Sequence, residues 1–339
     1  MLTSADREAY ELFRRRLWPY HSGAGYYEAA EFKYYLNPLS SLCPGSGLYG
    51  YFRADKLCGI MGAYPMPITL DGVVHPGHML VDWAVLPDLR FSPIAGLLWN
   101  ELFQLAGRKY ASYGSRFSQD SLLKRGVKIN SVNSAAIVSP LRTIAARLLQ
   151  IPYSYSYPSP FLLDKLEKCK GVNMIEGEQL KPAIPPHVEK TAWIHHGQAF
   201  WKMYCSARMY TGAVCLRVST DKGEADLVIN IRETGPSLRF ASLLSAQFVP
   251  YTTECAVSVG RSLRTFLKRH RIGLLWATET DPEMAAFLSS VAWYVHRSPS
   301  YWWSIPKTSD EFRHDSISWR LTGADRDSHF GGLQPWTEA

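Results

Sequence analysis

The segment 78–98, HMLVDWAVLPDLRFSPIAGLL, constrains the fold of this chain more than any other stretch. Its first eight residues are apolar at six positions, as in a strand that is largely buried. Proline, aspartate and serine then interrupt the apolar pattern, and aliphatic residues recur at helical spacing from Ile94 onward. Ser92 is placed to cap this helix and Pro93 to begin it. We therefore predict a strand, a tight turn and a helix.

A strand that runs through a tight turn into a helix N-terminus is suited to binding an anion. Backbone N–H groups converge at the start of the helix, and the helix dipole favours negative charge there. Pro93 has no N–H group to give. Ser92, Ile94 and Ala95 can still donate theirs, and the guanidinium of Arg90 can pair with a phosphate. We therefore expect this turn to hold the phosphate of a ligand.

The same turn carries a family resemblance. Residues 85–90, VLPDLR, resemble the V-x-P-x-x-R that opens the acyl-CoA pyrophosphate loop of the GCN5-related N-acetyltransferase (GNAT) family. That loop continues as R-x-x-G-x-G/A, and residues 90–95 read RFSPIA, so Pro93 replaces the central glycine. The resemblance implies a GNAT fold and an acyl-CoA co-substrate. The cofactor-binding residues that it implies are Val85, Arg90, Phe91, Ser92, Ile94 and Ala95.

The order of predicted elements around this turn supports the resemblance. Helices are predicted at 5–18 and 27–36, strands at 48–53 and 57–68, a hairpin turn at 70–73, then, after the central helix, a strand at 109–114, a short helix at 118–124 ended by Gly126, and the last strands within 128–138. Two helices, three antiparallel strands, helix, strand, helix and strand is the order of a GNAT domain. It covers roughly residues 1–145.

The remainder of the chain repeats this pattern loosely. Predicted elements are a helix at 198–209, strands at 213–218, 225–232 and 238–249, a helix at 254–270, a strand at 273–277 and a helix at 282–290 capped by Asp281. No glycine-rich turn precedes Glu254, so this part resembles a GNAT-like fold that has lost its CoA loop.

These patterns predict an α/β (α+β) protein with two tandem GNAT-like domains. Each domain is expected to be a mixed, mainly antiparallel sheet flanked by helices. The bounds that we predict are 1–148 for the N-terminal domain with the candidate acyl-CoA site, 149–186 for a linker, 187–330 for the C-terminal domain and 331–339 for a tail. Both ends of the linker region are rich in proline.

Composition narrows the classes of partner. Hydrophobic residues make up 46% and charged residues 20%, as in a globular protein. The formal charge of +7 is spread along the chain, which favours solvated helix faces over nucleic-acid binding and suits a small anionic ligand. The six cysteines form no C-x-x-C pair and no secretory signal pattern is seen, so we expect reduced thiols in a cytoplasmic protein. No apolar run reaches the ~20 residues of a membrane helix.

Acyl transfer to an amine requires a base for the ammonium proton, donors for the thioester carbonyl and an acid for the thiolate. Alternation along the strand predicts that residues 78, 80, 82 and 84 share one face. Asp82 is the first candidate for the base and His78 the second. The alternative is that Asp82 pairs within the fold. The tyrosine acid of the family falls on Leu122 here, which leaves Tyr113 or Ser118 as replacements.

Other motifs point away from metal and hydrolytic chemistry. His195 and His196 have no third ligand at metal spacing, so we expect no metal site there. Asp325-Arg326-Asp327 lacks the glycine and glutamate of a calcium loop, and we expect a solvated turn or a salt-bridge cluster. The absence of G-x-S-x-G, Walker A and H-E-x-x-H motifs disfavours a hydrolase, an NTPase or a metalloprotease.

The leading hypothesis is an acyl-CoA-dependent N-acyltransferase that acts on an amino-sugar or related small amine. Residues 319–327, WRLTGADRD, resemble the end of tandem GNAT-like proteins associated with bacterial surface-polysaccharide and peptidoglycan-bridge synthesis. One alternative is a FemAB-like aminoacyl transferase, or an N-acyl amino acid synthase that takes its donor from an acyl carrier protein. Another is a catalytically silent tandem GNAT-like binding or scaffold protein, which Pro93 and Leu122 favour.

Overall fold

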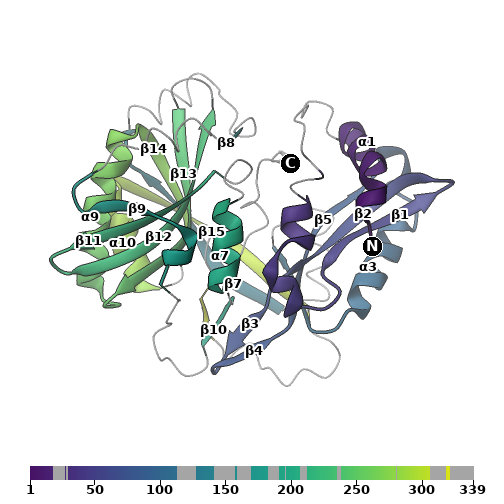
Figure 1. Cartoon of the computed structure of the whole chain (residues 1–339), viewed down its shortest axis with the longest axis horizontal. Helices are drawn as coiled ribbons and strands as arrows, with labels where there is room; N and C mark the ends of the chain where they lie inside the picture. Colours follow the sequence, from purple (N-terminus) through teal and green to yellow (C-terminus); the bar gives the residue numbers. More distant parts are fainter. Residues whose placement is uncertain are drawn as a thin grey trace.

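A computed structural model gives the fold of the chain (Figure 1). It describes residues 1–17, 27, 30–112, 127–140, 157–158, 169–181, 191–194, 196–206, 212–234, 238–279, 281–305 and 318–320. Several predicted features lie outside these residues, namely the helix at 118–124 with Leu122 and Gly126, the acid candidates Tyr113 and Ser118, His195, and Asp325-Arg326-Asp327.

A twelve-stranded sheet runs through the whole molecule. In spatial order its strands are β1 (Gly47–Arg53), β2 (Lys56–Pro65), β5 (Gly77–Val85), β6 (Arg108–Ser112), β15 (Tyr294–Ile305), β7 (Val127–Ile137), β14 (Ile272–Glu279), β13 (Leu238–Val249), β12 (Gly223–Thr234), β11 (Ala213–Thr220) and β9 (Val172–Ile175), with β8 (Tyr157–Pro158) beside β12. Among these pairs only β5 with β6 and β13 with β14 are parallel. The predicted mixed, mainly antiparallel sheet is confirmed.

The two parts of the chain exchange a strand at the centre of this sheet. We call residues 1–140 the first half and residues 157–320 the second half. Strand β15 of the second half pairs with β6, and β7 of the first half pairs with β14. β15 and β7 also pair with each other at the centre. The sheet is therefore continuous across both halves, and each half needs a strand of the other to cover its edge.

A smaller sheet also joins the halves. Its order is β16 (Ser318–Arg320), β10 (Thr191–Ile194), β3 (Ile68–Leu70) and β4 (Val73–His75). Within the predicted linker, β8 and β9 pair with β12 and β11, so part of that segment belongs to the main sheet. The exact domain bounds remain a prediction.

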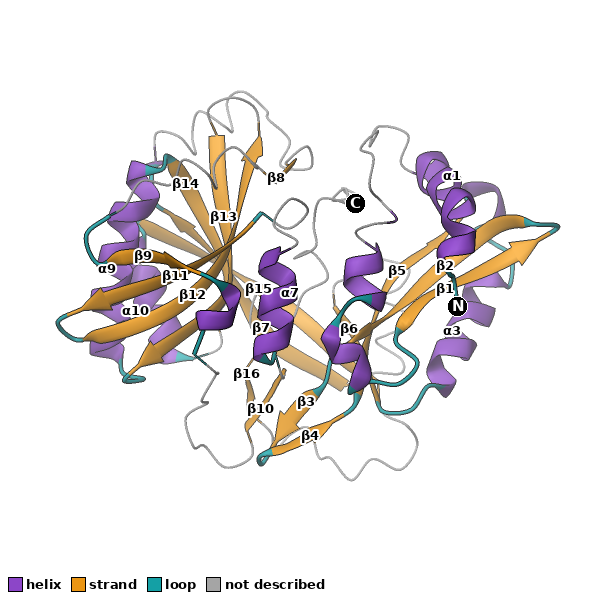
Figure 2. Cartoon of the chain, viewed as in Figure 1, coloured by secondary structure: helices purple, strands orange, loops and turns teal. Residues whose placement is uncertain are grey.

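Helices cover both faces of the main sheet. They are α1 (Arg7–Leu17), α3 (Ile94–Gln104), α7 (Gln198–Ser206), α9 (Thr253–Arg269) and α10 (Pro282–Val291), with short helical turns η1 (Ser4–Asp6), η2 (Glu31–Tyr35), η3 (Pro38–Ser41), η4 (Pro87–Leu89) and η6 (Gly177–Gln179). Figure 2 shows α9 and α10 on the outer side of the second half and α7 on its inner side. Among the described helices, none is long and apolar enough to cross a bilayer.

The hydrophobic core explains why the halves stay together. One cluster lies between α9, α10 and the second half of the sheet, and includes Val259, Phe266 and Phe287. Another joins α7 residues such as Phe200 with Tyr34 and other residues of the first half. Burial of apolar area at about 25 cal/mol per Å² stabilises this shared core.

Several local predictions hold and others need correction. Asp281 caps α10 as predicted, because its side chain accepts from the N–H of Met284 at 2.8 Å. The predicted strand 57–68 is broken into β2 and β3 at Pro65 to Pro67, since proline cannot continue a ladder. The sequence did not predict β15, whose Pro299 weakens the strand pattern.

Candidate functional site

The parallel strands β5 and β6 separate after three residue pairs. They pair at Gly77–Arg108, His78–Lys109 and Met79–Tyr110. Strand β5 then continues to Val85, and no further pair with β6 occurs among the described residues. The unpaired end of β5 leads directly into the turn that the sequence singled out. The end of β5 beyond these pairs and the turn that follows it therefore define the candidate site.

A β-bulge interrupts β5 at this unpaired end. Val81 pairs with Gly62 and Ala84 with Ile60, so that Asp82 and Trp83 together oppose one residue of β2. The backbone of Asp82 has a φ of 51°, in the left-handed region. The bulge turns Asp82 toward η2, while the ring of Trp83 lies 5.5 Å from that of Trp99 on α3.

The bulge corrects a prediction about the strand. Leu80 belongs to the core cluster under α3, whereas Val81 and Ala84 belong to the cluster that contains α1 residues. Asp82 lies on this second side, because the extra residue breaks the alternation. Residues 78, 80, 82 and 84 therefore do not share one face.

Asp82 is held in a buried ion pair. Lys33 Nζ donates to its Oδ2 at 2.8 Å and the Tyr34 hydroxyl donates at 2.5 Å. The side chains of Lys33 and Asp82 are only 6% and 8% exposed. Burial by itself raises the pKa of Asp82, but Lys33 and Arg14 outweigh it and bring the pKa to about 2. A carboxylate with so low a pKa is a weak base near neutral pH, which favours the pairing alternative.

Helix α1 completes the surroundings of this ion pair. Arg14 is only 2% exposed, although charged helix faces were predicted to be solvated. Its positive charge acts on both Asp82 and Tyr10. Burial raises the pKa of Tyr10 to about 12, so this phenol stays protonated. Tyr10 and Arg14 of α1, two η2 residues and Asp82 at the bulge thus form a single buried polar cluster.

Sequence reasoning missed most of this cluster. No local pattern links Lys33 to Asp82, which lie 49 positions apart. A weak signal existed for Arg14, because positions 10, 13, 14 and 17 fall on one face of a helix and the other three are apolar. An arginine at such a position is expected to point toward the core.

His78 is buried at the point where β5 and β6 still pair. It is 0% exposed, and its Nε2 donates to the carbonyl oxygen of Cys43 at 3.3 Å. Burial, followed by the positive charge of Lys109, lowers its pKa to about 4. The Lys109 ammonium donates to the carbonyl oxygens of Leu105 and Gly107 at 2.5 and 2.7 Å. His78 is therefore neutral and enclosed, which also disfavours it as the base.

The turn after β5 is tighter than predicted. Helix α3 begins at Ile94 with Pro93 as its N-cap, one residue later than expected. The N–H and the hydroxyl of Ser92 both bond to the carbonyl oxygen of Leu89, at 3.0 and 2.6 Å. Ser92 is thus committed within the turn, and its hydroxyl oxygen also accepts a long hydrogen bond of 3.5 Å from the N–H of Ile94. We predicted that the Ser92 N–H would donate to a phosphate, but this N–H already donates to the carbonyl oxygen of Leu89.

Donors for an anion remain at the start of α3. The Leu97 N–H donates to the Pro93 carbonyl in the first turn of the helix, so the N–H groups of Ala95 and Gly96 have no acceptor within the helix. The N–H of Ile94 has only its long bond to the Ser92 hydroxyl. Arg90 is exposed, and no ion pair with another described residue engages it. Phe91 is fully exposed, whereas Val85 packs at the edge of the core under α3. The turn thus offers backbone N–H groups and the Arg90 guanidinium as candidate partners for an anion.

The second half contains the same strand arrangement with a different turn. β13 and β14 pair from Arg239–Ile272 to Ser242–Trp276 and no further. A bulge comes next at Leu244, because Leu243 pairs with Ile229 and Ser245 with Val228. The Thr252 hydroxyl then caps α9 by accepting from the N–H of Cys255 at 3.3 Å.

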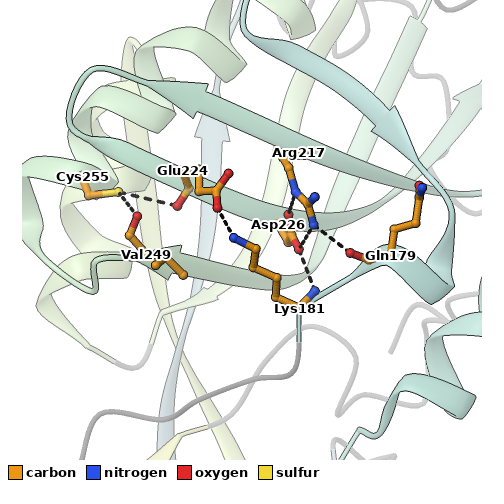
Figure 3. Close-up of polar contacts among 7 residues, drawn as sticks. All are labelled: Gln179, Lys181, Arg217, Glu224, Asp226, Val249 and Cys255. Atoms are coloured by element: carbon orange, nitrogen blue, oxygen red, sulfur yellow. Dashed lines mark hydrogen bonds and ion pairs between the residues drawn. The ribbon is translucent and has the colours of Figure 1, made fainter.

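A polar network on the second half is already satisfied (Figure 3). Arg217 Nε and Nη2 donate to the Asp226 carboxylate at 2.7 and 2.9 Å, and the N–H of Lys181 donates to it at 2.7 Å. Arg217 also donates to the carbonyl oxygen of Gln179, and Lys181 pairs with Glu224. These bonds fix the segment after η6 against β11 and β12, which is a structural role. Among the described residues, no cluster of three or more metal-ligating side chains occurs.

The sequence matches no protein-family model and no curated protein. Solved structures do resemble the chain. A GCN5-related N-acetyltransferase from Anabaena variabilis matches with a TM-score of 0.51 and 11% identity, covering 88% of this chain and 70% of that one. This chain has the GNAT fold. A probable N-acyltransferase from Enterococcus faecalis gives a TM-score of 0.54 with 10% identity and 89% and 70% coverage. A GCN5-related N-acetyltransferase from Kribbella flavida matches with a TM-score of 0.51 and 10% identity, covering 89% of this chain and 69% of that one.

Proposed function

We propose that the protein is an acyl-CoA-dependent N-acyltransferase. The observation that carries this proposal is the separation of β5 from β6 beside a turn whose helix N-terminus and Arg90 are open to an anion. The GNAT fold of the chain agrees with it. A thioester donor fits such a site, since its pyrophosphate needs N–H donors and a cation while its long arm needs an unpaired strand edge.

The donor would be held by the first half. Its pyrophosphate would accept bonds from the N–H groups of Ile94 and Ala95 and pair with Arg90, with Phe91 and Val85 alongside. A backbone N–H along the end of β5 beyond its pairs with β6 would polarise the thioester carbonyl. The acceptor amine would then attack the carbonyl carbon, and the thiolate would leave. We further propose an amino-sugar or similar small amine as acceptor, on the resemblance of residues 319–327.

Asp82 has two possible roles, and one variant separates them. If Asp82 is the base, Asp82→Asn lowers the kcat of the folded protein while donor binding persists. If it anchors the bulge through Lys33, the same variant lowers stability first, because Lys33 stays buried without its carboxylate. The contacts of Asp82 support the second role. His78→Gln provides the equivalent test for the second candidate.

The decisive experiment is mass spectrometry of small molecules that co-purify with the full chain, followed by titration with acetyl-CoA and longer acyl-CoAs. The full chain is required, because an isolated first half would lack β15 at the edge of β6. Arg90→Ala should weaken donor binding, and the exposed Arg53→Ala at the β1–β2 turn is the matched control. Transfer is then measured on a panel of amino-sugars. If no acyl-CoA binds, the proposal fails.

A scaffold protein is the second candidate, and specific observations favour it. Pro93 removes one N–H from the turn, and Ser92 is engaged with Leu89. Asp82 is engaged with Lys33. A protein of this class would bind neither acyl-CoA nor pantetheine, and neither Arg90→Ala nor Asp82→Asn would then change any turnover.

A further inference from the structure

Two cysteine thiols lie side by side in the second half. Cys205 is near the end of α7 and Cys215 is on β11, ten positions later, and their sulfur atoms are 2.8 Å apart. All six cysteines are described and are free thiols. The polar contacts of Cys43, Cys58 and Cys255 are with backbone groups, not with another sulfur. Among the described contacts, the one between Cys205 and Cys215 thus brings two thiols together.

The two thiols differ in access. Cys215 is 3% exposed and belongs to the core beneath α7, together with Val228 and Leu244. Cys205 is partly exposed and packs on the edge of the same cluster. The hydrogen bond with Cys205, followed by burial, raises the pKa of Cys215 well above its usual range. A small oxidant therefore meets Cys205 first, while Cys215 waits beside it as a thiol.

We propose that Cys205 and Cys215 form a reversible disulfide and make this position an oxidation site of the protein. Peroxide is the class of oxidant that fits. Cys205 sulfur attacks one peroxide oxygen, the O–O bond breaks, and a sulfenic acid and water result. Cys215 sulfur then attacks Cys205 sulfur and expels the second oxygen as water. Overall, two thiols lose two electrons and two protons, and one hydrogen peroxide becomes two waters.

The disulfide would act on the helix that connects the halves. α7 packs Phe200 and Trp201 into the shared core, and Tyr204 exchanges hydrogen bonds with Asn230 at 2.8 and 3.2 Å. Cys205 comes directly after Tyr204, so a bond to Cys215 ties this end of α7 to β11 beside that polar pair. Oxidation thereby restricts α7 relative to the sheet, whatever reaction the protein performs.

Peptide mapping of the full chain tests the proposal. Trypsin cuts after Lys202, Arg208 and Arg217, so the two cysteines fall on separate peptides, 203–208 and 209–217. After stoichiometric hydrogen peroxide and alkylation, we expect these peptides linked and two hydrogen atoms lighter than their sum. Four of the six thiols should remain alkylated, and dithiothreitol should restore all six.

Variants and a stability measurement complete the test. Cys205→Ser and Cys215→Ser should each abolish the linked species, whereas Cys169→Ser should keep it. Oxidation should raise the thermal midpoint of the wild type by a few degrees and leave both pair variants unchanged. A sulfinic acid at Cys205 without a linked peptide would overturn the proposal. So would a peroxide-induced disulfide between other cysteines in place of this one.

Discussion

The two halves of the molecule use the same strand arrangement and differ in the turn that leads out of it. In each, a parallel pair separates after a few residues and the first strand then bulges, at Asp82 in β5 and at Leu244 in β13. The chain then turns into α3 or α9. The strands around the separation are therefore arranged alike in the two halves, and the turns and the bulge residues are where these two places differ most clearly.

The turns differ in charge and in available donors. The first turn of α3 has no acidic residue, and Arg90 stands next to it. The first turn of α9 carries Glu254, and Thr252 already accepts from the N–H of Cys255. Glu254 pairs with Lys222 at 3.0 Å, and a negative charge in the first turn disfavours a phosphate at the same helix N-terminus. This difference supports the proposal that the first half binds the anion.

The bulge residues differ as strongly. Asp82 has a left-handed backbone and a buried partner in Lys33, whereas Leu244 belongs to the apolar core beneath α7. The first half thus contains a buried charge pair where the second half has a hydrocarbon side chain. Such a pair is costly to break and need not be stabilising as a whole.

The largest expected effect is on this pair. Asp82→Asn should lower the free energy of unfolding by about 3–5 kcal/mol, since Lys33 is left buried without its counter-charge. The double variant Asp82→Asn with Lys33→Met removes both charges, keeps a residue that tolerates the left-handed backbone, and should recover most of the loss. Urea unfolding of the full chain measures both. A double variant no better than Asp82→Asn would show that the ion pair specifies the bulge.

Donor binding is the next largest effect. Arg90→Ala should weaken acyl-CoA binding about ten- to a hundredfold, the range expected for hydrogen bonds to a charged group. Calorimetry on the full chain measures the Kd, and Arg53→Ala should leave it unchanged. Glu254→Gln should leave it unchanged as well. Equal losses from Arg90→Ala and Arg53→Ala would mean that binding depends on overall charge rather than on this turn.

The free energy of unfolding should depend on pH through a histidine of the first half. At the base of the separating strands, the first half has His78 and Lys109 where the second has Phe240 and Leu274. The pKa of His78 is lowered from 6.5 to about 4. Between pH 4 and pH 6.5 the unfolded chain therefore binds a proton at this histidine that the folded chain does not bind. Stability that is present above pH 6.5 is thus lost as the pH falls toward 4.

The variant that tests this pH effect is His78→Phe, which gives β5 the residue type that β13 has at Phe240. Chemical unfolding at several pH values should give a smaller slope between pH 6.5 and 4 for the variant than for the wild type. An identical slope would show that other groups titrate with folding in this range.

The smallest expected effect restores the missing donor. Pro93→Gly returns the glycine that the family loop carries, and with it one N–H at the start of α3. Donor binding should tighten a few-fold, as one additional hydrogen bond of about 1 kcal/mol allows. The change is read from the Kd for acetyl-CoA. Weaker binding would show that the rigid proline positions the turn better than the extra donor does.

Local elements were within reach of sequence reasoning. The segment 78–98 forms a strand, a turn and a helix as predicted, and Asp281 caps α10. These features depend on residues within a few positions of one another, so periodicity and capping chemistry report them. Pro93 shows the limit of that approach, because the bonds of Ser92 to Leu89 moved the helix start by one residue.

The tertiary structure decided which groups surround the site. The chain by itself determined that a strand leads into a helix N-terminus with an arginine beside it. It did not determine that Asp82 leaves the strand alternation, or that Lys33 meets it across 49 positions. Nor did it show that β7 and β15 cross to the opposite half. Register, bulges and strand exchange are set by contacts between distant segments, and a buried charge is stable only where a distant partner completes it.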